Sequence, residues 1–193
     1  MRAMADQREG SQSLRKSSRV SPLLGSAVFL LLAHGTIAGL VPWLISHWQI
    51  RPPLLGFTPF RAIGIVLIVA GIPVLLESFG RFALRGLGTP APVFPTQHLV
   101  VSGLYRYVRN PMYVGVFCIN MGQGLLLGNL DVLIYAALVW LAMHLFVVGY
   151  EEPTLRRRYG AEFDFFCRNV PRWIPRVTPW QVNPASTDSS RTP

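Results

Sequence analysis

Residues 111–150 read PMYVGVFCINMGQGLLLGNLDVLIYAALVWLAMHLFVVGY. This segment holds two uncharged runs, residues 111–128 and 132–150, which only residues 129–131 separate. The runs are 18 and 19 residues long, close to the ~20 that an α-helix needs to cross a bilayer. Because so short a connection joins antiparallel neighbours, the segment predicts a transmembrane helical hairpin.

Two further apolar segments precede the hairpin. Residues 23–46 contain no ionisable group except His34, and residues 62–80 can span a bilayer if Glu77 and Ser78 lie at the interface. Of the 193 residues only 14% are Asp, Glu, Lys or Arg, against about 25% in soluble domains. We therefore expect an all-α membrane protein with about four transmembrane helices rather than a soluble domain.

The net charge of +9 suits either a nucleic-acid binder or a membrane protein whose basic residues set its orientation. Sixteen of the 18 Lys and Arg residues lie before residue 22, between the second and third predicted spans, or after residue 150. A four-span topology places these segments on one side and only Arg51 and Arg61 on the other. The positive-inside rule therefore predicts a multi-pass protein of a bacterial inner membrane, with both termini cytoplasmic and no nucleic-acid partner.

The composition divides the chain into four parts. They are a polar cytoplasmic tail over 1–21, a two-span scaffold over 22–80, a segment over 81–180 with the hairpin and a cytoplasmic helix, and a polar tail over 181–193. In the cytoplasmic helix Leu155, Tyr159, Phe163 and Phe166 recur at helical spacing and form one apolar stripe. Such a stripe is typical of an amphipathic helix that lies on lipid headgroups.

Small and polar residues inside the predicted spans indicate where helices meet. Gly35 and Gly39 have the spacing that lets two helices approach closely. Asn120 and Gln123 share one helix face, where they either join the third span to a neighbour or line a pocket. His144 is expected to be a hydrogen-bonded helix residue rather than a ligand.

Polar residues gather at the cytoplasmic mouth of the third predicted span. They are Tyr105, Arg106, Tyr107, Arg109, Asn110, Pro111 and Tyr113. Two arginines and three tyrosines exceed what an interface anchor requires, so this cluster is a candidate binding site. Because Arg and Tyr also anchor helices at membrane interfaces, the residues alone leave both interpretations open.

Two adjacent carboxylates, Glu151 and Glu152, lie where the fourth predicted span ends. Adjacent residues of an α-helix differ by about 100°, so we expect only one of them to point into the bundle. An inward carboxylate needs a cation, because an unpaired buried charge is costly. That cation is Arg106, Arg109 or Arg172, or it belongs to a ligand; a solvated acidic face is the alternative.

A rigid segment, VPRWIP over residues 170–175, follows the cytoplasmic helix. Its two prolines bracket Arg172 and Trp173, so it is expected to be extended and to fold back over the hairpin mouth as a lid. No metal site is expected, because Cys118 and Cys167 have no His or acidic residue at ligand spacing.

Four pieces of the chain follow one another in a recognisable order. They are GLYRYVRNPMYVG over 103–115, Glu151-Glu152 with Leu155, Tyr159-Gly160, and Val170-Pro171-Arg172 with Pro175. Through them residues 86–176 resemble the integral-membrane methyltransferase family of isoprenylcysteine carboxyl methyltransferases and phospholipid methyltransferases. The resemblance implies a membrane methyltransferase that binds S-adenosylmethionine from the cytosol and methylates a lipophilic or small-molecule acceptor. The methyl group would pass by in-line displacement to a carboxylate, an amine or a thiol.

The same resemblance assigns roles to individual residues. Candidates for the cofactor pocket are Tyr105, Arg106, Arg109, Asn110, Pro111, Tyr113 and Gly115. Glu151 and Glu152 are candidates for binding the cofactor's ammonium group. Arg172 is the candidate catalytic residue, near the acceptor or the cofactor's carboxylate.

The chain departs from the family pattern at three of its positions. Asn110 stands where a His is common, and Phe163 and Phe166 stand where Tyr often occurs. Asn keeps a donor and an acceptor but does not titrate near neutral pH. These departures support the alternative, a non-enzymatic membrane assembly or scaffold protein that keeps the fold without binding the cofactor.

Overall fold

The computed structural model describes residues 30–85, 99 and 101–181, and every regular element within these ranges is a helix. The predicted all-α class is therefore confirmed for this part of the chain. The predicted polar tails, apart from Gln181, lie outside the described residues, and so do the first residues of the first predicted span.

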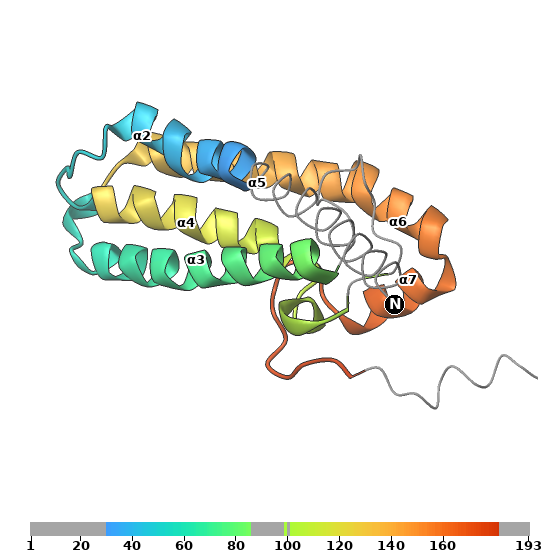
Figure 1. The fold of residues 1–193 in the computed structure, drawn as a ribbon. Helices are drawn as coiled ribbons and strands as arrows, with labels where there is room; N and C mark the ends of the chain where they lie inside the picture. The colour runs from blue at the N-terminus through green and yellow to red at the C-terminus, as the bar shows by residue number, and fades with distance from the viewer. Residues whose placement is uncertain (1–29, 86–98, 100, 182–193) are drawn as a thin grey trace, which may run out of the picture.

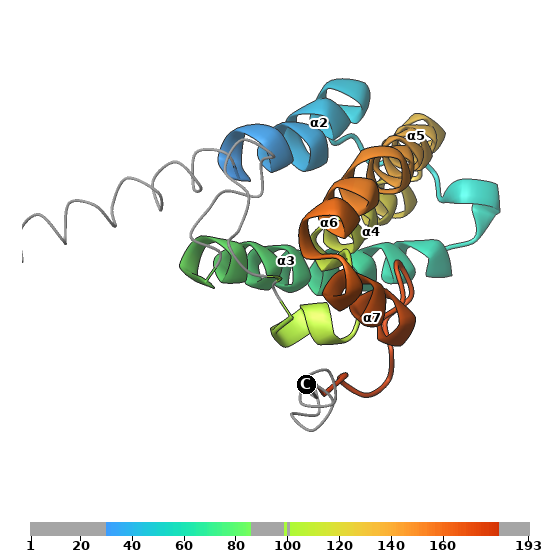
Figure 2. The ribbon, with the colours of Figure 1, turned by 90° about the vertical axis from the view of Figure 1, so that its right-hand side faces the viewer.

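Four helical stretches lie side by side in the bundle of Figure 1. They are η1 (Leu30–His34) and η2 (Thr36–Leu40) with α2 (Val41–Ser46), then α3 (Pro59–Arg85), α4 (Pro111–Leu127) and α5 (Leu130–Phe146). Helix α5 continues through η5 (Val147–Glu151) into α6 (Glu152–Tyr159), and α7 (Ala161–Asn169) follows at the same end of the bundle (Figure 2). The connections contain two short 3-10 helices, η3 (Leu54–Gly56) and η4 (Gly103–Arg106).

The connection between α4 and α5 is shorter than the sequence predicts. Gly128 ends α4 with φ of 65°, a left-handed conformation that glycine adopts without strain. The Asn129 side chain then accepts hydrogen bonds from the backbone N–H groups of Asp131 and Val132, at 3.0 and 3.2 Å. This N-cap starts α5 at Leu130, so two residues predicted to lie in the turn belong to the helix.

Two helices are long and apolar enough to cross a membrane by length and composition, Pro59–Arg81 and Leu130–Tyr159. The apolar helices Leu32–Ser46 and Pro111–Leu127 are shorter. Many large apolar side chains on α3 and α5 face outward, as lipid-facing side chains do. Two predicted spans thus pass this test, and the four-span topology stays a prediction.

Helices α3 and α4 touch through two pairs of glycines. A Cβ atom on Gly64 would lie 2.6 Å from the Gly122 carbonyl oxygen, and one on Gly122 would lie 2.7 Å from the Gly64 oxygen. Gly71 and Gly115 oppose each other in the same way, at 2.9 and 3.0 Å. Because these approaches involve rigid backbone atoms, no larger residue fits at the contact.

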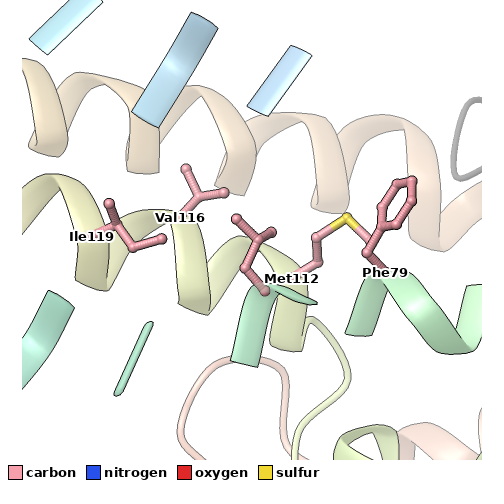
Figure 3. Close-up of a cluster of buried hydrophobic side chains, with 5 residues drawn as sticks. Phe79, Met112, Val116 and Ile119 are labelled. Carbon is pink, nitrogen blue, oxygen red and sulfur yellow. The ribbon is translucent and has the colours of Figure 1, made fainter. Parts of the chain in front are cut away.

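A small apolar cluster fills the space beside this contact (Figure 3). It consists of Leu75, Phe79, Met112, Val116 and Ile119, all of them buried. Ile37 and Ala38 of η2 and two residues of α5 pack against it. The cluster therefore joins all four helical stretches of the bundle.

The prediction that Gly35 and Gly39 form a close helix contact is wrong for the described residues. A Cβ atom built on either glycine has no heavy atom within 4 Å. The spacing identifies a ridge of small residues, but it does not tell which helix face another helix covers.

The first helical stretch contains a wide turn immediately before a proline. The Val41 N–H bonds to the Thr36 oxygen, five residues back, instead of to the Ile37 oxygen. The following residue, Pro42, has no N–H to offer the Ala38 oxygen. Two backbone carbonyls inside the bundle, those of Ile37 and Ala38, therefore lose their usual α-helical donors.

Side chains from the hairpin helices supply the donors instead. Gln123 Nε2 donates to the Ala38 oxygen at 2.7 Å, and Tyr135 Oη donates to the Ile37 oxygen at 2.8 Å. Gln123 thus joins helices, which confirms one of its two predicted roles. Asn120 is fully buried, and its amide atoms have no hydrogen-bond partner within the described residues.

The apolar stripe of the cytoplasmic helix does not lie on lipid headgroups, and that prediction is wrong. Gly160, with φ of 54°, divides the predicted helix into α6 and α7. Phe163 and Phe166 are only 2% and 4% exposed, so the protein itself covers them. The residues that surround them are Leu99, Val101, Leu155, Tyr159, Cys167, Val170 and Trp180. The stripe is therefore the core of a small unit at one end of the bundle.

We predict that Gly64→Ala destabilises the fold by about 1–3 kcal/mol, the usual cost of overpacking. The matched control is Gly80→Ala on the same helix, where a Cβ has no atom within 4 Å. That change should be neutral or stabilise by up to about 1 kcal/mol through helix propensity. Unfolding of both variants in detergent measures the difference, and equal stabilities would contradict the glycine contact.

Candidate functional site

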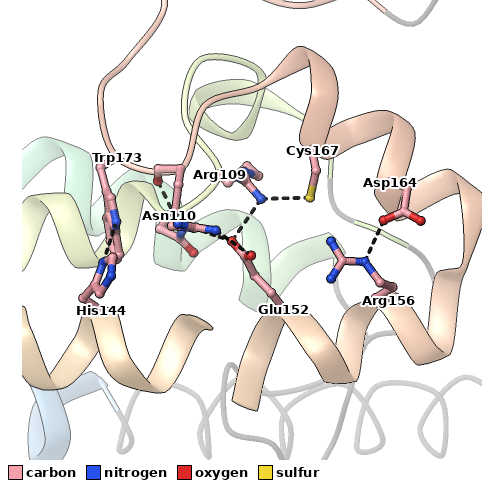
Figure 4. A network of polar contacts seen from close by, with 9 residues as sticks. Arg109, Asn110, His144, Glu152, Arg156, Asp164, Cys167 and Trp173 are labelled. Atoms are coloured by element: carbon pink, nitrogen blue, oxygen red, sulfur yellow. Dashed lines mark hydrogen bonds and ion pairs between the residues drawn. The ribbon is translucent and has the colours of Figure 1, made fainter. Parts of the chain in front are cut away.

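Glu152 lies at the centre of a polar network at the end of the bundle where α4 begins and α6 starts (Figure 4). It is 8% exposed. Its Oε1 accepts from Arg109 Nη1 at 2.9 Å and from Arg172 Nε at 2.6 Å, while Oε2 accepts from Arg172 Nη2 at 2.9 Å. One carboxylate therefore holds two guanidinium groups, one of them in bidentate geometry.

The VPRWIP segment folds back over this network, as the sequence predicts. The Arg109 backbone N–H donates to the Pro171 oxygen at 2.9 Å, and Asn110 Nδ2 donates to the Arg172 oxygen at 3.2 Å. Trp173 Nε1 donates to His144 Nδ1 on α5 at 3.1 Å. The segment is thus fixed at three consecutive residues.

Glu151 also points into the site, so the prediction that only one of the two carboxylates does so is wrong. Its Oε2 accepts from the Tyr113 hydroxyl at 3.1 Å. The reason is the wide turn η5, in which the Glu152 N–H bonds to the Val147 oxygen five residues back. A π turn spreads more residues around each turn and brings adjacent side chains closer in direction.

The two carboxylates differ in their partners. Glu152 has two arginines, whereas Glu151 forms no ion pair in the part of the chain that the structure describes. Among the described residues, the hydrogen-bond donor to Glu151 is the neutral Tyr113 hydroxyl. When ionised, Glu151 is therefore open to pairing with a cationic ligand group.

Tyr105 lies close to this acidic side of the site and is 7% exposed. Burial raises the pKa of its hydroxyl well above the ordinary value, and the negative charge of Glu151 adds to the increase. The hydroxyl therefore stays protonated at physiological pH, so Tyr105 is a hydrogen-bonding group rather than a base.

The sequence analysis did not identify two polar residues near Glu151 as part of the site. They are Ser102 and Glu77. Glu77 pairs with Arg81, four residues further along α3, and a Cβ on Gly103 would collide with this pair. Three buried polar atoms at this end have no hydrogen-bond partner among the described residues: Glu77 Oε2, Ser102 Oγ and Arg109 Nε. An ionisable residue near the end of a span was the available signal for Glu77; no pattern pointed to Ser102.

Three predicted pocket residues have structural contacts elsewhere. Arg106 Nε donates to the Trp180 oxygen at 2.6 Å, and the Arg106 oxygen accepts from the Trp180 N–H at 2.9 Å. Pro111 is the first residue of α4, where its missing N–H costs nothing. Gly115 forms the helix contact described above. The residues that the fold does bring together are Tyr105, Arg109, Asn110, Tyr113, Glu151, Glu152 and Arg172.

Cys167 of α7 touches the same network, since Arg109 Nη1 lies 2.8 Å from its Sγ. Burial raises the pKa of the thiol, the Arg109 charge opposes that increase, and the Glu152 charge adds to it. Within the described ranges, no group of three or more His, Cys, Asp and Glu side chains could hold a metal ion.

Comparison with known proteins gives matches over the same region. The family model described as phospholipid methyltransferase matches residues 60–162, just over half of the chain. The protein-S-isoprenylcysteine O-methyltransferase of Schizosaccharomyces pombe is 34% identical over 80 residues, which cover 41% of this chain and 34% of that protein. The Mus musculus protein of the same name is 28% identical over 159 residues, covering 76% and 54%.

A third relative has a different kind of name. The nickel-cobalt-cadmium resistance protein NccN of Alcaligenes xylosoxydans xylosoxydans is 31% identical over 80 residues, covering 42% of this chain and 37% of that protein. The chain thus spans about a third to a half of the length of these relatives. No solved structure gives a significant match.

The charges around Cys167 predict its reactivity. In a Cys118→Ala background, iodoacetamide should modify Cys167 slowly at neutral pH, because its raised pKa keeps the thiol protonated. Glu152→Gln removes a negative charge that favours the protonated thiol, so the midpoint of the pH–rate curve should move to lower pH. Mass spectrometry measures the rates, and Glu162→Gln, at an exposed position of α7, is the control. An unchanged midpoint in Glu152→Gln would contradict the proposed contact network.

Proposed function

Because the chain belongs to the phospholipid methyltransferase family, we propose that it is an S-adenosylmethionine-dependent methyltransferase of the membrane. It would move a methyl group to a small or lipidic acceptor by in-line displacement. The observation that carries this proposal is the position of Glu151, an acidic group without an ion pair in the described chain, beside two arginines that share one carboxylate. The names of the two relatives called protein-S-isoprenylcysteine O-methyltransferase support the same class of reaction.

The residues of the site fit the chemistry of this methyl donor. Its amino-acid end carries an ammonium and a carboxylate, so the site needs an anionic and a cationic side chain close together. Glu151 would bind the ammonium, and Arg109 and Arg172 would bind the carboxylate. Arg109 Nε has no hydrogen-bond partner among the described residues, so it is a donor that this side can offer. Tyr105 and Tyr113 supply aromatic rings, which favour adenine stacking or contact with the sulfonium.

Glu152 would have a different role from its neighbour. With two arginines already bound to it, Glu152 holds Arg109 and Arg172 in place rather than contacting the ammonium. We assign Arg172 as the candidate catalytic residue, because the lid carries its guanidinium to the same network as Arg109 and Glu152. When bound, the donor supplies an electrophilic methyl group on its sulfonium.

The protein's contribution would be alignment of the two reactants and exclusion of water. Tyr105 stays protonated and cannot act as a base. An acceptor carboxylate needs no base, whereas an amine or a thiol must lose a proton before or during transfer. The apolar outer faces of α3 and α5 would place the acceptor's apolar part in the bilayer.

The alternative is a non-enzymatic membrane protein, and one of the arguments for it becomes weaker in the structure. Asn110 departs from the family's common His, but its side chain still donates to the Arg172 backbone at 3.2 Å. Asn110 therefore makes a contact that positions the Arg172 backbone. Donor binding to the purified protein separates the two functions.

We predict that Glu151→Gln weakens S-adenosylmethionine binding by about 1.5–3 kcal/mol, the range for a hydrogen bond to a charged group. Stability should change little, because Glu151 has no ion pair to lose within the described residues. Isothermal titration calorimetry on the detergent-purified protein measures the affinity, and a thermal melt measures the stability.

Glu152→Gln is the matched variant at the adjacent position. It should lower thermal stability as well as affinity, because it leaves Arg109 and Arg172 without their shared carboxylate. Equal effects of the two variants on both quantities would contradict the division of roles. If the unaltered protein binds no donor, the proposed function is wrong.

The membrane topology is tested separately. If four helices cross the membrane with the basic segments in the cytoplasm, reporter fusions after residues 95 and 190 should give cytoplasmic signals. A fusion after Leu130, the first residue of α5, should give a signal on the opposite side. A cytoplasmic signal at Leu130 would show that the hairpin does not cross.

A further inference from the structure

Three aromatic rings cluster beside the Glu152 network, two from α5 and one from the lid. The imidazole of His144 stacks on Trp140, with ring centroids 5.3 Å apart and planes 26° apart. Its other neighbour is Trp173 of the lid, at 5.8 Å and 34°. All three side chains are half-buried. The Trp140 and Trp173 centroids are themselves 6.1 Å apart, so the imidazole packs in one cluster with a ring of its own helix and a ring from a segment about 30 residues further along the chain.

A hydrogen bond joins two of these three rings. Trp173 Nε1 donates to His144 Nδ1 at 3.1 Å (Figure 4). A ring nitrogen that accepts a hydrogen bond carries no proton, so the neutral imidazole has its proton on Nε2. The bond joins α5 to the lid at a point where no other hydrogen bond between them is recorded for the described residues.

The position of the Trp173 ring affects the residue before it. Arg172 precedes Trp173 directly, and Pro171 and Pro175 restrict the backbone on both sides. Arg109 N and Asn110 Nδ2 hold backbone oxygens of the lid, and the Arg172 side chain binds Glu152. The contact with His144 is thus a second side-chain anchor, on the residue next to Arg172, and it fixes the direction in which Trp173 faces.

We propose that His144 is a positioning residue of the site. Through Trp173 it holds the Arg172 guanidinium on Glu152, in the place where Arg172 would meet the donor's carboxylate or the acceptor. This inference rests on the proposed function for its ligand, but the contact between the lid and α5 exists without it. His144 itself touches no reacting atom in this arrangement.

The first test measures S-adenosylmethionine affinity of the full chain by calorimetry. His144→Leu removes the acceptor and should weaken binding about three- to tenfold. His144→Asn, whose Oδ1 can occupy the position of Nδ1, should restore most of the affinity. The control is Tyr135→Phe on the same helix, which also removes one hydrogen bond but at the far part of the bundle. If His144→Leu and Tyr135→Phe leave affinity equally unchanged, the proposal is overturned.

A double-mutant cycle tests the route through Arg172. If His144 acts by placing Arg172, the double variant His144→Leu/Arg172→Ala should bind no more weakly than Arg172→Ala alone. Additive effects of the two changes would overturn the proposal. Trp173→Phe removes the donor and keeps a ring, so it replaces His144→Leu in the cycle if that variant does not fold.

A third measurement separates this inference from the proposed function. In protein labelled with 5-fluorotryptophan, the Trp173 fluorine resonance, assigned with Trp173→Phe, should sharpen in His144→Leu and not in His144→Asn. If the resonance sharpens in His144→Leu but the unaltered protein binds no donor, His144 does hold Trp173 and the proposed function is wrong. If the resonance is unchanged in His144→Leu, His144 does not hold Trp173 and the proposal is overturned.

Discussion

The pairing of Glu152 with Arg109 and Arg172 determines how the functional end of the molecule is assembled. A buried carboxylate without a cation is costly, and this one is 8% exposed. Its two partners come from the loop before α4 and from the lid, so three distant segments must meet at one point. Once they do, Glu151, Tyr105 and Tyr113 are left facing the same space.

Two prolines accompany wide helical turns that change which groups a helix presents to its neighbours. Pro42 and Pro153 each stand two residues after a π-helix, η2 and η5. In the first case the displaced carbonyls are met by Gln123 and Tyr135, which tie the first helical stretch to the hairpin. In the second case the wide turn directs both glutamates into the site. A wide turn beside a proline thus joins one helix to its neighbours, and in the other helix it turns two carboxylates toward the same site.

Hydropathy predicted the helices of the bundle within a few residues, because runs of uncharged residues indicate burial in lipid or protein directly. The lid also followed from the positions of its prolines. The sequence did not predict which helix covers an apolar or small-residue face. Gly35 and Gly39 have the expected spacing and no neighbour, whereas Gly64 and Gly122, far apart in the chain, carry the contact. Periodicity identifies the face of a helix, but only the tertiary fold decides what covers it.

The distribution of charge in the site matches one end of the proposed methyl donor. Glu152 is one negative charge shared by two positive ones, so its side of the site keeps a positive excess. Within the described residues Glu151 has only a neutral hydroxyl as its partner, so an ionised Glu151 gives its side a negative excess. Adjacent positions on one helix therefore present a separated positive and negative charge. An amino-acid group carries the same separation in the opposite sense, and a ligand with only one of the two charges would leave half of this arrangement unpaired.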